Sequence, residues 1–212
     1  MVILTSIVQF YIRPRMASPS PVRGSPLQPG DWVRVALMQL AREGVESVRV
    51  EVLARELGVS KGSFYWHFRD RDELLMQMLD RWESSESEWL AAEESGQSER
   101  LAPAARWARF VERTAAPDRI SEEIAVRAWA RRDERVATRV MGIEKRKVRV
   151  IAAVLADIGF ARDTAESWSE LVSLVCLGWL DRTARDGDFR SAGRGLGEFL
   201  SDLVLAASAA NR

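Results

Sequence analysis

The 212-residue sequence contains a single cysteine, Cys176, and a single histidine, His67. One cysteine excludes an internal disulfide framework and a metal site built from several cysteines. One histidine excludes paired histidine ligands and leaves little room for a serine–histidine–aspartate triad elsewhere in the chain. The sequence therefore predicts no metal centre, no cofactor and no hydrolytic machinery of that kind.

An excess of charge of either sign is also absent, because 31 basic residues balance 31 acidic ones. The chain lacks an overall positive field for nucleic acid, although this balance is compatible with a local basic face. Hydrophobic residues make up 47% and charged residues 29%, which is typical of a soluble globular chain.

No apolar run is long enough to cross a bilayer, which takes about 20 residues. Residues 1–12 are mostly apolar, but Arg13 and Arg15 follow them, whereas a signal peptide places its positive charges first. We predict that residues 1–30 form a disordered arm, or that translation starts at Met16 and the preceding residues are an over-long gene start. With no export signal and an unpaired cysteine, we expect a cytoplasmic protein without a membrane partner.

From Asp31 onward the apolar residues recur at helical spacing, and no strand-like alternation persists. Gly44 and Gly58 are expected to end the first two helices, and Asp70 or Asp72 to begin a long fourth one, at about 71–89. Further helices are predicted at about 103–115, 121–131, 133–156, 163–185 and 192–209. The expected fold is all-α, with an N-terminal three-helix unit at 31–80 and a helical region at 81–212.

Residues 51–75 carry the strongest functional signal. Two short helices meet at Gly58-Val59, as in a helix-turn-helix, whose second helix enters the major groove of DNA. Phe64 and Phe68 are four residues apart and can hold this second helix to the core. The polar-tipped aromatic residues between them cannot all be buried as well, so they should lie at the surface beside lysine and arginine.

The segment Gly58-Val59-Ser60-Lys61-Gly62-Ser63-Phe64-Tyr65-Trp66-His67-Phe68, with residues 69–75 after it, resembles the TetR family of bacterial transcriptional regulators. The resemblance covers residues 31–80; beyond them it rests on helical content, length and a loose pattern at 127–133. It implies a DNA-binding domain at 31–80 and a ligand-binding and dimerisation domain at 81–212.

The resemblance also implies roles for single residues in a recognition helix at 60–68. Base and nearby backbone contacts fall on Lys61, Gly62 and Ser63, and phosphate contacts on Tyr65, His67 and Arg71. Trp66 is expected to be half packed and half in the interface. The predicted DNA-binding set is therefore Ser60, Lys61, Gly62, Ser63, Tyr65, Trp66, His67 and Arg71.

The start of the second helix departs from the family pattern. Val50 stands where the family commonly has a threonine that caps the helix and contacts phosphate, and Glu51 beside it would repel phosphate. Ser47 is the nearest hydroxyl that could replace the cap. The departure affects the contacts expected from this helix, not the helix-turn-helix itself.

Aromatic residues are frequent after residue 80. Packing in the core and in a dimer explains any single one of them best, but family members enclose a small-molecule pocket among the middle helices. Together with Arg106 or Arg127, these side chains would suit an apolar or aromatic ligand that carries an acidic group. The predicted ligand-binding residues are Trp107, Phe110, Trp129, Trp168 and Trp179.

Two other segments each allow two interpretations. Residues 131–149 hold eight basic and three acidic residues, which suits either a second nucleic-acid face or, with more weight, a solvated and salt-bridged helix. Residues 193–197 are rich in glycine, but no strand precedes them, so they should mark the start of the last helix, not a dinucleotide site.

We therefore expect a homodimeric repressor that binds a palindromic operator on double-stranded DNA and is released by a small-molecule effector. The helix at 163–185 is apolar nearly all round, so it and the helix at 192–209 are predicted to form the dimer interface. The alternatives are a helical adaptor whose helix-turn-helix does not bind DNA, and an enzyme with a helical core. No nucleophile–base pair supports the enzyme.

Overall fold

The computed structural model describes residues 27–95 and 101–210, and every regular element in these ranges is helical. The all-α prediction is therefore confirmed. The proposed arm up to residue 26, with Met16, lies outside the described residues, and the first helix already begins at Pro29. The elements are α2 (Pro29–Glu43), η1 (Val45–Ser47), α3 (Val50–Leu57), α4 (Lys61–Tyr65), α5 (Arg71–Glu94), α6 (Pro103–Ala115), α7 (Pro117–Ala130), α8 (Glu134–Ile158), α9 (Arg162–Asp186) and α10 (Phe189–Ala210).

The helix ends follow from short-range chemistry. Gly44 and Gly58 end α2 and α3 with φ angles of 80° and 70°, a region that costs glycine little. The Asp70 side chain accepts a hydrogen bond from the backbone N–H of Glu73, 2.9 Å away, so Asp70 and not Asp72 caps α5. Proline occupies the first turn of α2, α6 and α7, where a missing N–H costs nothing.

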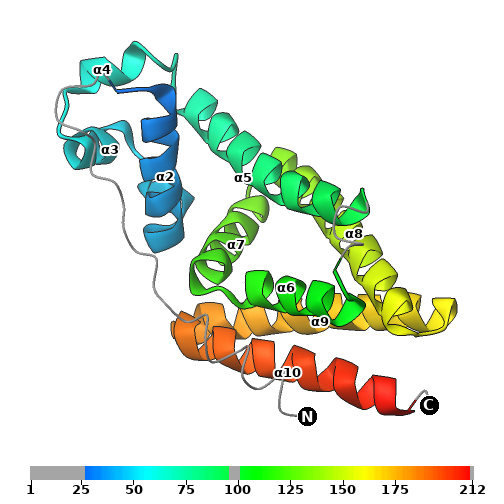
Figure 1. Cartoon of the computed structure of the whole chain (residues 1–212). Helices are drawn as coiled ribbons and strands as arrows, with labels where there is room; N and C mark the ends of the chain where they lie inside the picture. Colours follow the sequence, from blue (N-terminus) through cyan, green and yellow to red (C-terminus); the bar gives the residue numbers. More distant parts are fainter. Residues whose placement is uncertain (1–26, 96–100, 211–212) are drawn as a thin grey trace.

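Helices α2, α3 and α4 form a small head at one end of the molecule, and α5 starts in this head and runs away from it (Figure 1). The buried residues of the head gather around Trp32, whose ring lies edge to face with the Phe64 ring at a centroid distance of 5.3 Å, and they are continuous with the core of the body. Below the head, α8 packs along α5 and α9, and α10 packs on α6. The fold thus joins the head to a larger helical body through the long helix α5 and through the packing of α2 on α7.

Ion pairs also connect the head and α5 with the α7–α8 region. Arg132 contacts Glu46 at 3.0 Å, and Arg135 contacts Asp72 at 2.9 Å. Farther along α8, Arg146 pairs with Glu94 of α5 at 2.8 Å. Basic residues of the 131–149 run are therefore paired with acids on η1 and α5. The structure supports the salt-bridged interpretation of this run over a second nucleic-acid face.

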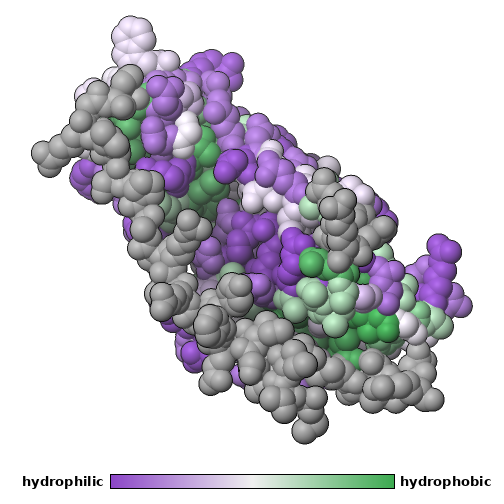
Figure 2. All heavy atoms as spheres, viewed as in Figure 1, coloured by the Kyte–Doolittle hydropathy of each residue, from purple (hydrophilic) through white to green (hydrophobic). Residues whose placement is uncertain are grey.

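The described helices include none that is both long and apolar enough to span a bilayer. Hydrophilic residues predominate on the visible face of the head and along α5, and hydrophobic colour shows in patches on the head and on the lower part of the body (Figure 2).

Gly193 lies where α10 crosses α6, not at a helix start as the sequence suggested, because α10 already begins at Phe189. A Cβ atom on Gly193 would lie 2.2 Å from the carbonyl oxygen of Ala115. Since this neighbour is backbone, it cannot rotate away. Only glycine permits this close helix crossing without movement of one helix.

We expect Gly193→Ala to lower the free energy of unfolding by about 1–3 kcal/mol, the usual cost of overpacking. Gly142→Ala is the matched control, because Gly142 is an exposed residue of α8 and an added Cβ there meets nothing within 4 Å. That control should be neutral or slightly stabilising, since alanine favours helix over glycine. Urea unfolding followed by circular dichroism measures both, and equal midpoints would contradict the close crossing.

Candidate functional site

The helix-turn-helix consists of α3 and α4, joined at Gly58 and Val59. Phe64 and Phe68 are both buried and stack with ring centroids 5.1 Å apart, which fixes the short helix α4 to the head. Between them, Tyr65 and Trp66 are exposed to 63% and 87% of their surface. Buried and exposed aromatic residues thus alternate as the sequence indicated, and α4 lies at the outer end of the head (Figure 1).

Trp66 is more exposed than expected. The sequence suggested that half of the indole packs against the chain, and the structure corrects this, because the turn after Tyr65 directs it to solvent. His67 and Ser63 are half-buried, whereas Ser60, Lys61 and Gly62 are exposed. Nothing inside the molecule crowds Gly62, since an added Cβ would meet only the Ser60 hydroxyl at 3.6 Å.

Lys61 is already paired. Its ammonium group lies 2.7 Å from Oε1 of Glu51 on α3, and both side chains are largely exposed. The hydrogen bond from Lys61 lowers the pKa of Glu51 below its usual value, so this carboxylate stays charged at neutral pH. Lys61 and Glu51 therefore partly neutralise each other on the surface where phosphate contacts are expected.

Two residues near the head make contacts that the sequence did not indicate. Arg71 donates from Nε to the Val48 carbonyl and from Nη2 to the Val45 carbonyl, both at 2.6 Å, which leaves Nη1 for other partners. Ser47 does not cap α3: its hydroxyl donates to the Gly44 carbonyl at 2.6 Å, and Arg49 holds the N-cap position without a side-chain cap. The expectation for Ser47 was wrong, because η1 uses up this hydroxyl.

The helical body contains two adjoining cavities. The first, here called the inner cavity, is about 80 Å³ and lies among α5, α6, α7, α8 and α9. It is lined by Glu86, Trp89, Phe110, Arg113, Thr114, Arg119, Ile120, Glu123, Arg127, Glu144, Lys147, Ile151, Ser173, Cys176, Leu177 and Leu180.

Charged side chains fill much of the inner cavity. Glu86 is buried and accepts from Arg113 at 2.8 Å, from Lys147 at 2.9 Å and from Arg119. Burial lowers the pKa of Lys147. The Arg113 guanidinium also stacks over the Trp89 ring, 5.2 Å from its centroid. Three part-buried cations thus share Glu86, while Arg119 also pairs with Glu122 and Lys147 with Glu123.

Cys176 borders the same cavity as a free thiol. Burial raises its pKa to about 12, so almost none of it is thiolate at neutral pH. The cysteine is therefore a packing residue and not a nucleophile.

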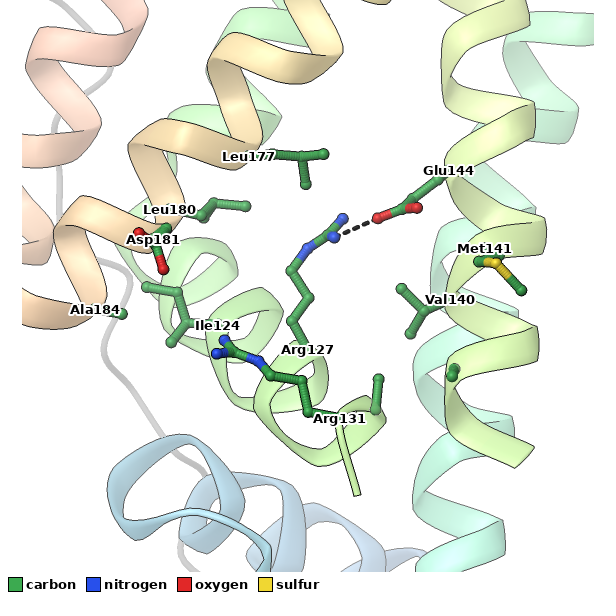
Figure 3. A pocket seen from close by; sticks show the side chains of 12 residues that line it. Ile124, Arg127, Arg131, Val140, Met141, Glu144, Leu177, Leu180, Asp181 and Ala184 are labelled. Atoms are coloured by element: carbon green, nitrogen blue, oxygen red, sulfur yellow. Dashed lines mark hydrogen bonds and ion pairs between the residues drawn. The ribbon is translucent and has the colours of Figure 1, made fainter. Parts of the chain in front are cut away.

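The second cavity, here called the outer cavity, is about 350 Å³ and opens between α7, α8 and α9 (Figure 3). Arg127 reaches across it to Glu144, and this ion pair also borders the inner cavity. The lining residues are Ile124, Arg127, Ala130, Arg131, Ala137, Val140, Met141, Glu144, Leu177, Leu180, Asp181 and Ala184.

Of the five predicted ligand-binding aromatics, Phe110 lines the inner cavity. Trp107 and Trp129 are buried in the hydrophobic core, Trp168 packs against Phe160, and Trp179 stacks on Phe199 while its indole N–H donates to the Ala192 carbonyl. Arg106 is likewise committed, to Glu93 and Asp157. Of the two arginines expected near a ligand, Arg127 lines both cavities.

Sequence reasoning missed Glu86 and Lys147. One signal was available: in α5, Glu86 continues the buried stripe of Met78, Leu79, Trp82 and Leu90 at helical spacing. A carboxylate on an apolar stripe requires buried cations opposite it. Which cations these are depends on how α6, α7 and α8 pack.

Residues 33–78 match the model of the bacterial regulatory proteins of the tetR family. These residues include α3, α4 and most of the head described above. Residues 33–78 therefore match the TetR family. The expected helix-turn-helix and the resemblance of this region to the TetR family are confirmed.

Curated relatives match a segment of the chain of similar length. The HTH-type transcriptional regulator AcrR of Shigella flexneri is 40% identical over 53 residues, which cover 25% of this chain and 23% of that protein. The class A tetracycline repressor protein from transposon 1721 of Escherichia coli is 43% identical over 49 residues, or 23% of each chain. The chain thus matches less than a quarter of the length of these relatives.

Solved structures share the fold over most of the chain. A putative transcriptional regulator from Saccharomonospora viridis, in complex with choline, has a TM-score of 0.68 at 20% identity and covers 83% of this chain and 94% of its own. A putative TetR-family regulator from Rhodococcus sp. has a TM-score of 0.57 at 18% identity, covering 82% and 98%. The regulator FadR from Bacillus subtilis, in complex with stearoyl-CoA, has a TM-score of 0.50 at 15% identity, with the same coverage.

Proposed function

We propose that this protein is a homodimeric transcriptional repressor that binds a palindromic operator and leaves it when a small molecule binds the helical body. DNA binding is assigned to 31–80, and ligand binding and dimerisation to 81–212. The observation that carries the proposal is the pair of exposed aromatic side chains, Tyr65 and Trp66, on a short helix held by buried Phe64 and Phe68. Exposed aromatic side chains next to a lysine indicate a binding surface, and this combination is suited to contact with the DNA backbone.

The exposed apolar residues of the last two helices support a dimer. Leu171 and Leu174 on α9 and Phe199 on α10 are all more than one third exposed. Burial of such residues against a second copy removes apolar surface from water. A two-fold axis through α9 and α10 would present two α4 helices to half-sites about 34 Å apart, or a multiple of that distance.

The contacts between head and body support regulation by a ligand. The outer cavity is lined by the end of α7 and the start of α8, and Arg132 and Arg135 in this same region pair with Glu46 and Asp72. A ligand that moves α7 against α8 would thus shift the head. A coupling free energy of about 1–3 kcal/mol is enough for regulation. Two structural neighbours are described as complexes with choline and with stearoyl-CoA, which supports a ligand-binding body.

The proposal is tested by fluorescence anisotropy with DNA from upstream of the protein's own gene and with a scrambled duplex, at two salt concentrations. We expect selective, salt-dependent binding by the wild-type protein. Tyr65→Ala should weaken binding at least about tenfold, the effect of losing roughly 1.4 kcal/mol, while the thermal midpoint stays within a degree or two because Tyr65 is exposed. Leu174→Asp should shift the protein from dimer to monomer in light scattering.

A helical adaptor is the alternative outcome. It is favoured by the Glu51–Lys61 pair, which offsets one positive charge of the head, and by the two Arg71 hydrogen bonds to carbonyls, which leave fewer Arg71 donors for phosphate. Weak binding that is equal for both duplexes and unchanged by Tyr65→Ala would establish the adaptor instead.

Removing the Glu51 charge should strengthen DNA binding. Glu51→Gln abolishes the charged partner of Lys61 and a repulsive carboxylate near phosphate, so we expect severalfold tighter binding at low salt and a steeper salt dependence. The matched control is Glu56→Gln on the same helix, where the carboxylate pairs with Arg42. Unchanged affinity for Glu51→Gln would mean that α3 lies away from the DNA backbone.

A further inference from the structure

The outer cavity has one uncommitted charge. Its two carboxylates are both paired, Glu144 with Arg127 and Asp181 with Arg185. Arg127 in turn contacts Glu123 at 2.8 Å. By contrast, no carboxylate among the described residues forms an ion pair with the Arg131 guanidinium, which points into the cavity in Figure 3. The charge that the cavity offers to a ligand is therefore positive.

The rest of the lining is aliphatic. The walls are formed by Ile124, Val140, Met141, Leu177 and Leu180. Met141 is half exposed, because no other described residue covers it. At about 350 Å³ the cavity falls at the lower end of the range for small-molecule sites. A flexible methionine next to branched aliphatic side chains adapts to an alkyl chain.

A cationic headgroup such as a quaternary ammonium does not fit this lining. Such groups are recognised by aromatic rings, and the lining of the outer cavity contains none. In the inner cavity the face of Trp89 is already occupied by Arg113. The outer cavity therefore lacks the aromatic ring that would recognise such a headgroup, and in the inner cavity Arg113 already covers Trp89.

We propose that the outer cavity binds an amphipathic molecule with an alkyl body and one anionic group, a carboxylate above all, which pairs with Arg131. The role of this molecule as the effector rests on the proposed function, whereas its binding to the outer cavity does not. The anion would sit at the end of α7, two residues from the Asp133 side chain that caps α8. Arg131 therefore defines the specificity of the site for anions.

Isothermal titration calorimetry of the full chain with three probes of equal chain length tests this proposal: decanoate, decanol and decyltrimethylammonium. We expect decanoate to bind at least about tenfold tighter than decanol, since a charge-assisted hydrogen bond contributes that much, and the cation to bind least. Arg131→Gln should lower the affinity for decanoate to that for decanol. Arg132→Gln is the matched control, because Arg132 points to Glu46 instead.

Ala137→Phe fills the cavity and should abolish binding of all three probes, with circular dichroism as the check on folding. Equal affinity for decanoate and decanol, tighter binding of the cation, or full decanoate binding by Arg131→Gln would overturn the proposal. These results do not depend on DNA. Decanoate binding that leaves operator affinity unchanged would refute its role as effector while the site itself stands.

Discussion

Replacing Glu86 with glutamine should lower the free energy of unfolding by about 3–5 kcal/mol, the usual cost of breaking a buried ion pair from one side. Glu86 is 2% exposed and is the shared partner of Arg113, Arg119 and Lys147. Glutamine keeps the shape of the side chain but removes the carboxylate shared by these part-buried cations, so that Arg119 and Lys147 keep only Glu122 and Glu123 as ion-pair partners. Few single changes in the helical body should cost more.

The loss of folding stability in Glu86→Gln should depend on pH. Burial already lowers the pKa of Lys147, and loss of the Glu86 charge lowers it further. Between the lowered pKa of Lys147 in the folded protein and its ordinary pKa in the unfolded chain, the unfolded chain binds more protons. Folding stability then rises with pH. The difference between Glu86→Gln and the wild type should therefore be smaller at pH 9.5 than at pH 7.

Urea unfolding at both pH values measures this effect. Glu94→Gln serves as the control, since Glu94 is an exposed residue of the same helix that pairs with Arg146, and such surface pairs contribute about 0–1 kcal/mol. If both variants lost the same small amount, the buried charge cluster would not be the organising centre of the body.

Phe64→Ala should also cost about 3–5 kcal/mol, as expected for a buried phenylalanine. The Phe64 side chain is fully buried and contacts the rings of Trp32 and Phe68. Helix α4 has five residues, too few to persist without tertiary contacts. Losing Phe64 should therefore release α4 from the head and abolish operator binding at 37 °C.

Substitution of the neighbouring residue, Tyr65, distinguishes an effect on DNA recognition from an effect on folding. Tyr65→Ala should weaken DNA binding at nearly constant thermal midpoint, whereas Phe64→Ala should lower both, and Phe64→Leu should recover part of each. Thermal melting and anisotropy on the same samples measure the two effects. Operator binding by Phe64→Ala at wild-type strength would show that α4 is not the recognition helix.

Much of the fold could be predicted from the sequence because helix boundaries are local. Gly44, Gly58 and Asp70 act within one turn of the chain, and the spacing of apolar residues predicted the α-helices, whereas the short 3-10 helix η1 was not expected. The alternation of buried Phe64 with exposed Tyr65 also follows from helical geometry alone. The family resemblance rests on this same short region.

The ends of the longer helices were predicted less accurately from the sequence. Helix α7 begins at Pro117, where the sequence suggested 121, because a proline in the first turn begins a helix as well as it interrupts one. Helix α10 begins at Phe189 and not at 192, so its glycines lie inside it and allow close approach to α6. Local patterns do not distinguish a glycine at a helix start from one at a helix crossing.

The sequence by itself determined that this chain is helical, that it has a helix-turn-helix, and that Tyr65 faces outward from it while Phe64 and Phe68 are buried, since these depend on neighbours within about one turn. The tertiary structure alone decided the partners of its charges and the walls of its cavities. Arg135 meets Asp72 across 63 residues of sequence, and Glu86 of α5 gathers cations from α6, α7 and α8. Long side chains pair by proximity in space, and helical periodicity carries no information on which helices will lie together.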